Sequence, residues 1–326
     1  MKKLLMMLVL MPLTGLADKE TVDGIEWTYT VKDGKARIEE GLSQSATGSI
    51  TIPSMLGGCP VTSIGRNEFR SGSGWRVFGK CCNLTSVTIS SNVTSIGDSA
   101  FCGCSNLTSV TIPASLTNVC RCAFSNCGAL RSFAVDDKNA KYSSRSGLLC
   151  SKDGTTLVAG VNGDVTIPSC VKNIGDYAFR GCDGLKSVMI PLGVESIGSS
   201  AFSGCIGLAS VVIPASVKRI GRYAFARCSG LMSFCVDEGN SSYSSRNGLL
   251  CSKDGATLVA GVNCDAVIPP CVKNIEGYAF DCCSGLKSVV IPSSVANIGT
   301  HAFGRCSGLR TVAIPSSVVD IGFCAF

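Results

Sequence analysis

The chain has 326 residues, of which 45% are hydrophobic and only 16% are charged, and its formal net charge is +6. This length accommodates two ordinary domains or one elongated repeat array, and 37 glycines with few long polar runs favour the array. The basic residues are spread along the chain, apart from one small cluster at Arg66, Arg70, Arg76 and Lys80. Because nucleic-acid-binding proteins concentrate basic residues on one face, we expect no nucleic-acid partner.

Residues 1–17 have the pattern of a secretory signal peptide. Lys2 and Lys3 precede an apolar stretch, Leu4 to Leu13, and Gly15 and Ala17 are small residues suited to a cleavage site. The apolar stretch is shorter than the about 20 residues that a membrane-spanning helix needs. We therefore predict cleavage after Ala17, export, and no membrane insertion of the mature chain; an N-terminal core helix is the alternative.

Residues 18–48 are predicted to form a β-hairpin cap. Apolar residues alternate with polar ones from Ile25 to Val31, and Asp33-Gly34 is a preferred hairpin corner. A repeat array needs such a cap because an uncovered end exposes its core and its unpaired strand edges.

The rest of the chain, residues 49–326, repeats the string Ile-Pro-x-x-Val-x-x-Ile-Gly-x-x-Ala-Phe-x-x-Cys-x-x-Leu-x-x-Val-x with a period of 23. One coil of this size encloses too little volume for a core, so equivalent residues must stack on one another. The Leu-x-x-Val-x-Ile part predicts a short strand that Pro closes, and the Ala-Phe part predicts a turn or short helical segment. We therefore predict a β-rich solenoid that stops in mid-repeat at Phe326, as a fragment of a longer protein would.

Two longer units interrupt the regular period. Val135–Thr166 and Val236–Val267 share the strings Tyr-Ser-Ser-Arg and Gly-Leu-Leu-Cys-Ser-Lys-Asp-Gly at an offset of 101 residues. Asp-Gly again indicates a hairpin corner. We predict inserted β-hairpins at about 136–166 and 237–267, which interrupt the stack without ending it.

This repeat resembles the BspA-like leucine-rich repeats of bacterial and some protozoal surface proteins, over roughly Ile50 to Phe326. The resemblance implies a curved or twisted leucine-rich-repeat solenoid and export. It also implies adhesion to, or binding of, host or neighbouring-cell surface and matrix proteins. It implies neither catalytic residues nor a cofactor.

Eight of the 21 cysteines are assigned to one column of the repeat: Cys82, Cys104, Cys127, Cys182, Cys205, Cys228, Cys283 and Cys306. Equivalent positions of adjacent coils lie about 4.8 Å apart, whereas the Cβ atoms of a disulfide lie about 3.5–4.5 Å apart. We therefore expect a buried ladder of free thiols. An inter-coil disulfide among Cys102, Cys120 and Cys122 stays open. The paired knuckles and spaced histidines of zinc sites are missing from the sequence, so we predict no metal site.

The sequence carries no catalytic pattern. Its single histidine, His301, occupies the variable position before Ala302-Phe303, and nothing in the local sequence supports the Ser-His-Asp or Cys-His catalysis that would need it. No phosphate-binding loop with a following Lys-Ser/Thr occurs either. We predict that the chain is not an enzyme and binds no cofactor.

The outward side of the predicted strands is the candidate partner-binding face. Its apolar residues are Met189, Val212 and Val290, with Lys186 and Lys287 nearby. An exposed apolar stripe can mark a binding surface; the alternative is that exposed strands tolerate such residues. We predict a secreted or cell-surface protein-interaction module, and the alternative function is a structural spacer that presents a domain missing from this chain.

Overall fold

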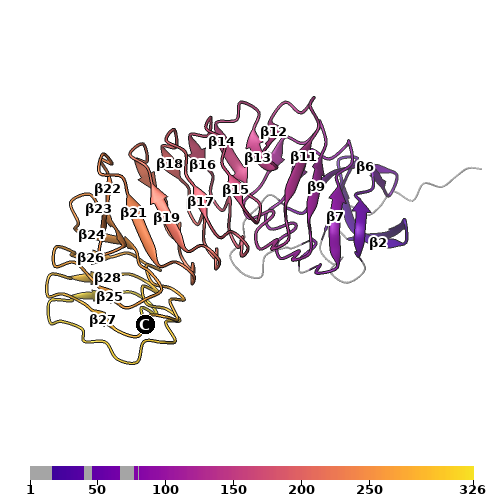
Figure 1. Cartoon of the computed structure of the whole chain (residues 1–326). Helices are drawn as coiled ribbons and strands as arrows, with labels where there is room; N and C mark the ends of the chain where they lie inside the picture. Colours follow the sequence, from indigo (N-terminus) through magenta and orange to yellow (C-terminus); the bar gives the residue numbers. More distant parts are fainter. Residues whose placement is uncertain (1–16, 40–45, 67–76, 80) are drawn as a thin grey trace, which may run out of the picture.

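The computed structural model describes residues 17–39, 46–66, 77–79 and 81–326, which form a solenoid of stacked coils (Figure 1). The described residues contain strands and turns but no helix, and the Ala-Phe segments from Ala100-Phe101 to Ala302-Phe303 are turns. The predicted leucine-rich-repeat solenoid is confirmed. Residues 1–16 of the predicted signal peptide, and Arg70, Arg76 and Lys80 of the basic cluster, lie outside the described residues.

Each coil contributes strands to two rows that run along the solenoid. The first strand row consists of β4 (Gly48–Thr51), β7 (Leu84–Thr88), β9 (Ser109–Ile112), β11 (Ser132–Val135), β15 (Val165–Thr166), β17 (Val188–Met189), β19 (Ser210–Ile213), β21 (Ser233–Val236), β25 (Ala266–Val267) and β27 (Val289–Val290). The second strand row contains β6 (Cys59–Ile64), β8 (Ser95–Ile96), β10 (Asn118–Val119), β16 (Asn173–Ile174), β18 (Ser196–Ile197), β20 (Arg219–Ile220), β26 (Asn274–Ile275), β28 (Asn297–Ile298) and β29 (Asp320–Ile321), together with the N-terminal and insertion strands described below. Figure 1 shows an arc in which β14, β16 and β18 run along the outer side and β15, β17 and β19 lie toward the inner side.

The 23-residue period becomes the register of the parallel strand pairs. Val87 pairs with Val110, and Val110 pairs with Phe133. Side chains alternate along each strand, so the Val and Ile of the first row point into the core and the Ser and Thr between them point outward. The stack therefore buries the same residue type at the same level in every coil.

The phenylalanines of the Ala-Phe turns form stacks of nearly parallel rings inside the solenoid. Phe78, Phe101 and Phe124 have centroid separations of 4.7 and 5.4 Å, and Phe179–Phe202 of 5.1 Å. These separations follow from the strand spacing of about 4.8 Å. Each buried ring contributes about 1.5–3 kcal/mol through the hydrophobic effect. The two insertions divide the rings into three stacks, which begin at Phe78, Phe179 and Phe280.

The N-terminal strands extend the second row. β1 (Asp18–Val22), β2 (Ile25–Lys32) and β3 (Lys35–Ile38) pair antiparallel, and β3 then pairs in parallel with β6. A short strand, β5 (Met55–Leu56), pairs with β6. Trp27, which is 1% exposed, packs its ring edge against Phe78 at 6.2 Å. The first coil thus has an aromatic neighbour on its N-terminal side.

The two insertions each contain three strands rather than the two expected around Lys-Asp-Gly. They are β12 (Tyr142–Arg145), β13 (Leu148–Ser151) and β14 (Thr156–Ala159), and then β22 (Tyr243–Arg246), β23 (Leu249–Ser252) and β24 (Thr257–Ala260). β14 and β24 pair in parallel with β16 and β26, so each insertion supplies one strand of the second row. Gly160 and Gly261 then approach the rings of Phe179 and Phe280 so closely that a Cβ atom would overlap the ring. Only glycine fits there.

Candidate functional site

The predicted face residues Met189 and Val212 lie side by side on the outward side of β17 and β19. Val188 pairs with Val211, which places the residue after each in adjacent positions. Met189 is 78% exposed and Val212 is 54% exposed, whereas Val188 and Val211 are buried. Val212 in turn pairs with the exposed Cys235 of β21. Met189, Val212 and Cys235 are called the central patch below.

Val290 does not join the central patch. It lies on β27 beside Val267 of β25, and the two side chains are 61% and 60% exposed. The turn of the second insertion lies between β21 and β25: Phe234 N donates to Gly248 O at 2.8 Å, and Asn247 Nδ2 donates to Val267 O at 3.0 Å. Val267 and Val290 therefore form a separate surface, called the C-terminal patch.

The two predicted lysines border different patches. Lys186 is exposed and lies three residues before Met189, next to the central patch. Lys287 lies three residues before Val290, and its N–H donates to Asp265 Oδ1 at 2.9 Å. Hydrogen bonds from the Ser288 and Lys287 N–H groups lower the pKa of Asp265, which keeps this carboxylate ionised. The C-terminal patch therefore carries both signs of charge, whereas Lys186 is a cation at the edge of the central patch.

Sequence reasoning missed three large exposed apolar residues that belong to the same coils as the central patch. Leu192 is 80% exposed, and Ile206 and Met232 are each 50% exposed. Met232 precedes Cys235 by the same three residues that separate Lys186 from Met189. Met232 therefore lies two periods of 23 residues after Lys186, and the same period that aligned Met189 with Val212 would have revealed it. Methionine side chains adapt to irregular partner surfaces, so Met189 and Met232 suit a binding role.

The cysteine ladder is buried, with one correction. Cys82 is exposed, and Cys81, which is 1% exposed, takes the place in the ladder. Its N–H donates to Phe78 O at 3.0 Å, as Cys104 N–H donates to Phe101 O at 3.2 Å. The ladder position follows three residues after the stacked phenylalanine, and in the first coil that phenylalanine is Phe78. Val77-Phe78 thus replaces the usual Ala-Phe pair.

The ladder thiols are chemically quiet. Cys127 Sγ donates to Phe101 O at 3.2 Å, and Cys228 Sγ donates to Phe202 O at 3.1 Å. Burial raises the pKa of both thiols to about 12, so the reactive thiolate is scarce at neutral pH. None of the 21 cysteines, all of which lie in the described part of the chain, forms a disulfide. The inter-coil disulfide left open for Cys102, Cys120 and Cys122 is not present in this structure.

Two cavities open on the surface. One, of about 190 Å³, lies where the coil of Cys120 and Cys122 meets the coil of Asp176 and Tyr177 across the first insertion. Beside it, Arg180 Nη1 lies 3.3 Å from Cys122 Sγ.

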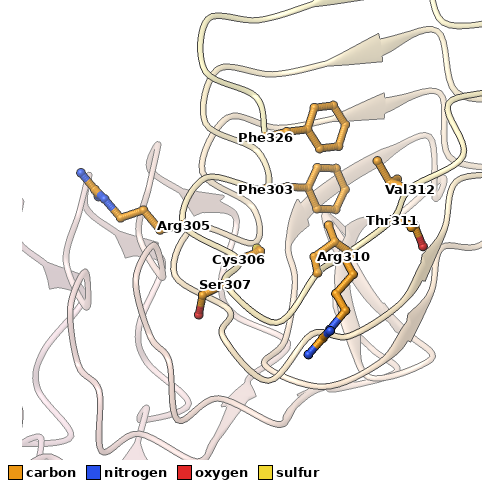
Figure 2. A pocket seen from close by; sticks show the side chains of 9 residues that line it. Phe303, Arg305, Cys306, Ser307, Arg310, Thr311, Val312 and Phe326 are labelled. Atoms are coloured by element: carbon orange, nitrogen blue, oxygen red, sulfur yellow. The ribbon is translucent and has the colours of Figure 1, made fainter.

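The second cavity, of about 340 Å³, lies beside the rings of Phe303 and Phe326 and is also lined by Arg310 and Val312 (Figure 2). Phe326 stacks on Phe303 at 5.2 Å and is 46% exposed. Two of the residues that line this cavity, Phe303 and Phe326, belong to the third phenylalanine stack.

His301 is partly exposed and packs against Tyr278, with ring centroids 4.9 Å apart. In the described ranges, no group of three or more His, Cys, Asp or Glu residues is arranged to hold a metal ion. A search of the same ranges for a helix long and apolar enough to cross a membrane also finds none.

Comparisons with known proteins identify the repeat. A family model described as "BspA type Leucine rich repeat region" matches six copies in residues 74–152, 162–249 and 264–326. No curated protein matches the chain. Among solved structures, a leucine rich cell surface protein from Faecalibacterium prausnitzii A2-165 is 26% identical, over 95% of this chain and 86% of that one, with a TM-score of 0.52. A leucine-rich repeat protein from Eubacterium ventriosum is 23% identical, over 96% of this chain and 95% of that one, with a TM-score of 0.49. The chain belongs to the BspA type leucine-rich-repeat family.

Proposed function

We propose that this chain is an exported, non-enzymatic module that binds a protein partner on a host cell, a neighbouring cell or the matrix through its central patch. The observation that carries the proposal is that exposed Met189, Val212 and Cys235 lie on three neighbouring paired strands. Soluble proteins rarely expose large apolar side chains together unless a partner covers them. The F. prausnitzii relative, which is described as a cell surface protein, supports export.

The chemistry of the patch indicates the kind of partner. The apolar side chains stand on paired strands, so their backbone is already ordered. Binding a partner there should therefore lose little backbone conformational entropy. Lys186 at the edge favours an acidic residue on the partner, which would accelerate encounter more than it would add affinity. A partner with an apolar centre and an acidic rim fits both features.

The experiment starts with purified residues 18–326 used to capture proteins from cell-surface and matrix extracts, followed by titration of each purified partner. Met189→Glu and Val212→Glu, made together, should weaken a specific partner by at least about tenfold, the loss expected when residues at the centre of an interface are replaced.

The matched control is Thr111→Glu, because Thr111 is exposed on β9 at the equivalent outward position of the first strand row. Val290→Glu tests the C-terminal patch separately. If charge at Met189 and Val212 leaves the affinity unchanged, the central patch is not the binding face. If a folded and monodisperse chain captures nothing, the alternative role as a structural spacer is favoured.

A further inference from the structure

A second surface differs in chemistry from the strand face. In each coil the residue just before the Ala-Phe pair turns the chain with a positive φ. This applies to Ser99, Cys122, Tyr177, Ser200, Tyr223, Tyr278, His301 and Cys324, with φ between 48° and 62°. Residues with bulky side chains rarely adopt this conformation. Serine occupies two of these corners, at Ser99 and Ser200, so the fold does not require an aromatic ring there. Strained positions that carry large side chains are candidates for function.

Four rings meet along this edge near the C-terminal end of the solenoid. Tyr223 and Tyr278 have centroids 4.6 Å apart, Tyr278 and His301 4.9 Å, and His301 and Phe323 6.0 Å. Tyr223 is 41% exposed and Phe323 76% exposed, and the other two rings are partly exposed. These residues are called the aromatic column below.

Guanidinium groups lie beside the aromatic column. Arg227 and Arg305 stand four residues after Tyr223 and His301, and they also have positive φ, 61° and 56°. Both approach the fully buried carboxylate of Asp281, with Arg227 Nε at 2.8 Å and Arg305 Nη1 at 3.7 Å. Because the single Asp281 carboxylate neutralises only one of the two guanidinium groups, this cluster keeps a net positive charge. Their side chains are 41% and 62% exposed, and Figure 2 shows Arg305 extending away from the core rings.

The backbone of this edge is already used. Tyr278 N–H donates to Thr300 O at 2.9 Å, and His301 N–H donates to Phe323 O at 3.0 Å. A peptide that binds by adding a strand needs free N–H and C=O groups, which these positions do not offer. Recognition here must use ring faces, the Tyr hydroxyls and the guanidinium groups.

We propose that the aromatic column binds an acidic oligosaccharide. The apolar C–H face of a pyranose ring would lie against a Tyr or His ring, and the sugar carboxylate would bind the Arg227 or Arg305 guanidinium, which suits planar carboxylates. Rings repeated from coil to coil match a ligand that is itself a chain of rings. This proposal does not depend on a protein partner at the central patch.

Isothermal titration with oligogalacturonate, against a neutral gluco-oligosaccharide of equal length, tests the proposal on purified residues 18–326. Tyr223→Ser and Tyr278→Ser keep the fold, because serine occupies the same corner at Ser99 and Ser200. Each should weaken binding by about tenfold or more, the loss expected for an aromatic residue at the centre of an interface. The matched control is Tyr177→Ser, since the Tyr177 ring lies at the first insertion next to Arg180 and away from the column.

Three results would overturn the proposal. The first is that the folded chain fails to bind oligogalacturonate, or binds the neutral sugar equally well. The second is that the Ser variants lower the melting temperature without changing the affinity, which would mean that the rings only stabilise packing. The third is that polyglutamate competes with the sugar at the same residues, which would make the surface a site for acidic peptides. Binding that falls with rising salt and is lost in Tyr278→Ser but not in Tyr177→Ser supports it.

Discussion

The two insertions offer an internal comparison, because their sequences correspond at an offset of 101 residues. Where the coils meet across the first insertion, Cys122 faces Arg180, with Sγ 3.3 Å from Nη1, and a cavity of about 190 Å³ lies beside them. Across the second insertion, Tyr223 takes the place of Cys122 and its ring contacts Tyr278 at 4.6 Å. Asp281 replaces Arg180 and pairs with Arg227 at 2.8 Å.

The polar groups that hold the insertions in place are the same in both. Asn139 and Asn240, both fully buried, donate from Nδ2 to Pro113 O at 2.7 Å and to Pro214 O at 2.8 Å. The Tyr142 hydroxyl accepts from Val119 N–H at 2.9 Å, and the Tyr243 hydroxyl accepts from Ile220 N–H at 2.7 Å. These hydroxyls occupy N–H groups that the insertion leaves unpaired at the edge of β10 and β20.

The difference between the two insertions therefore lies in a few corner side chains and not in the backbone. The buried amides that both insertions share hold each insertion on the coil before it. The corner residues differ, and with them the contact between the coils: rings meet at the second insertion, and a cavity lies at the first. A surface site can thus differ between two otherwise equivalent regions of one solenoid.

The largest expected effect tests what the two regions share. Phe179→Ala and Phe280→Ala should each lower the free energy of unfolding by about 3–5 kcal/mol, because each deletes a fully buried ring at the start of a stack. Urea unfolding monitored by circular dichroism measures both. A clear difference between the two variants would show that the insertions are not equivalent in the core.

The next effect separates the two regions. Arg227→Met removes the nearer partner of the buried Asp281 carboxylate and should cost about 1.5–3 kcal/mol, the range for hydrogen bonds to charged groups. Arg180→Met removes only a contact to a thiol and a partly exposed cation–π contact with Tyr177, so its cost should stay below about 1 kcal/mol. Equal losses in thermal unfolding would contradict this assignment.

Cys122→Tyr should convert the first region toward the second. The corner already has φ 56°, close to the 62° of Tyr223, so the new ring fits the backbone and can contact Tyr177. An aromatic pair contributes about 0.5–1.5 kcal/mol beyond area burial. Differential scanning calorimetry should show a higher melting temperature, with Tyr223→Cys as the reverse change. A lower melting temperature for Cys122→Tyr would mean that the cavity cannot accept the ring.

The smallest effect depends on pH. Glu276 stands where the first region has Gly175, and burial raises its pKa, while Arg222 partly opposes the shift. A carboxyl whose pKa is higher in the folded state favours folding while it is protonated, and that contribution is lost as pH rises from the unfolded pKa through the folded one. Glu276→Gln should therefore be slightly more stable than the parent at neutral pH, and the difference should vanish in acid. Urea unfolding across this pH range measures it, and a difference that grows toward low pH would have the wrong sign.

The regular coils were predictable because the repeat in the sequence specifies which residues of neighbouring coils stack on one another. Residues spaced by 23 must stack when no single coil can bury its own core, so the strand column, the phenylalanine stacks and the buried cysteines follow from the period. The first coil shows the limit: its irregular length led to Cys82 in place of Cys81, since only the position of Phe78 in the ring stack sets the ladder there.

The sequence by itself determined that this chain is a solenoid and which residue types occupy its core. Only the tertiary structure decided where the surface is interrupted. Met189 and Val290 occupy the same column in sequence, yet the turn at Asn247 separates them, and Tyr223 and Tyr278 touch although the whole second insertion lies between them in the chain. The physical reason is that stacking energy depends on which coils are adjacent in space, and an insertion changes that adjacency without changing the repeat.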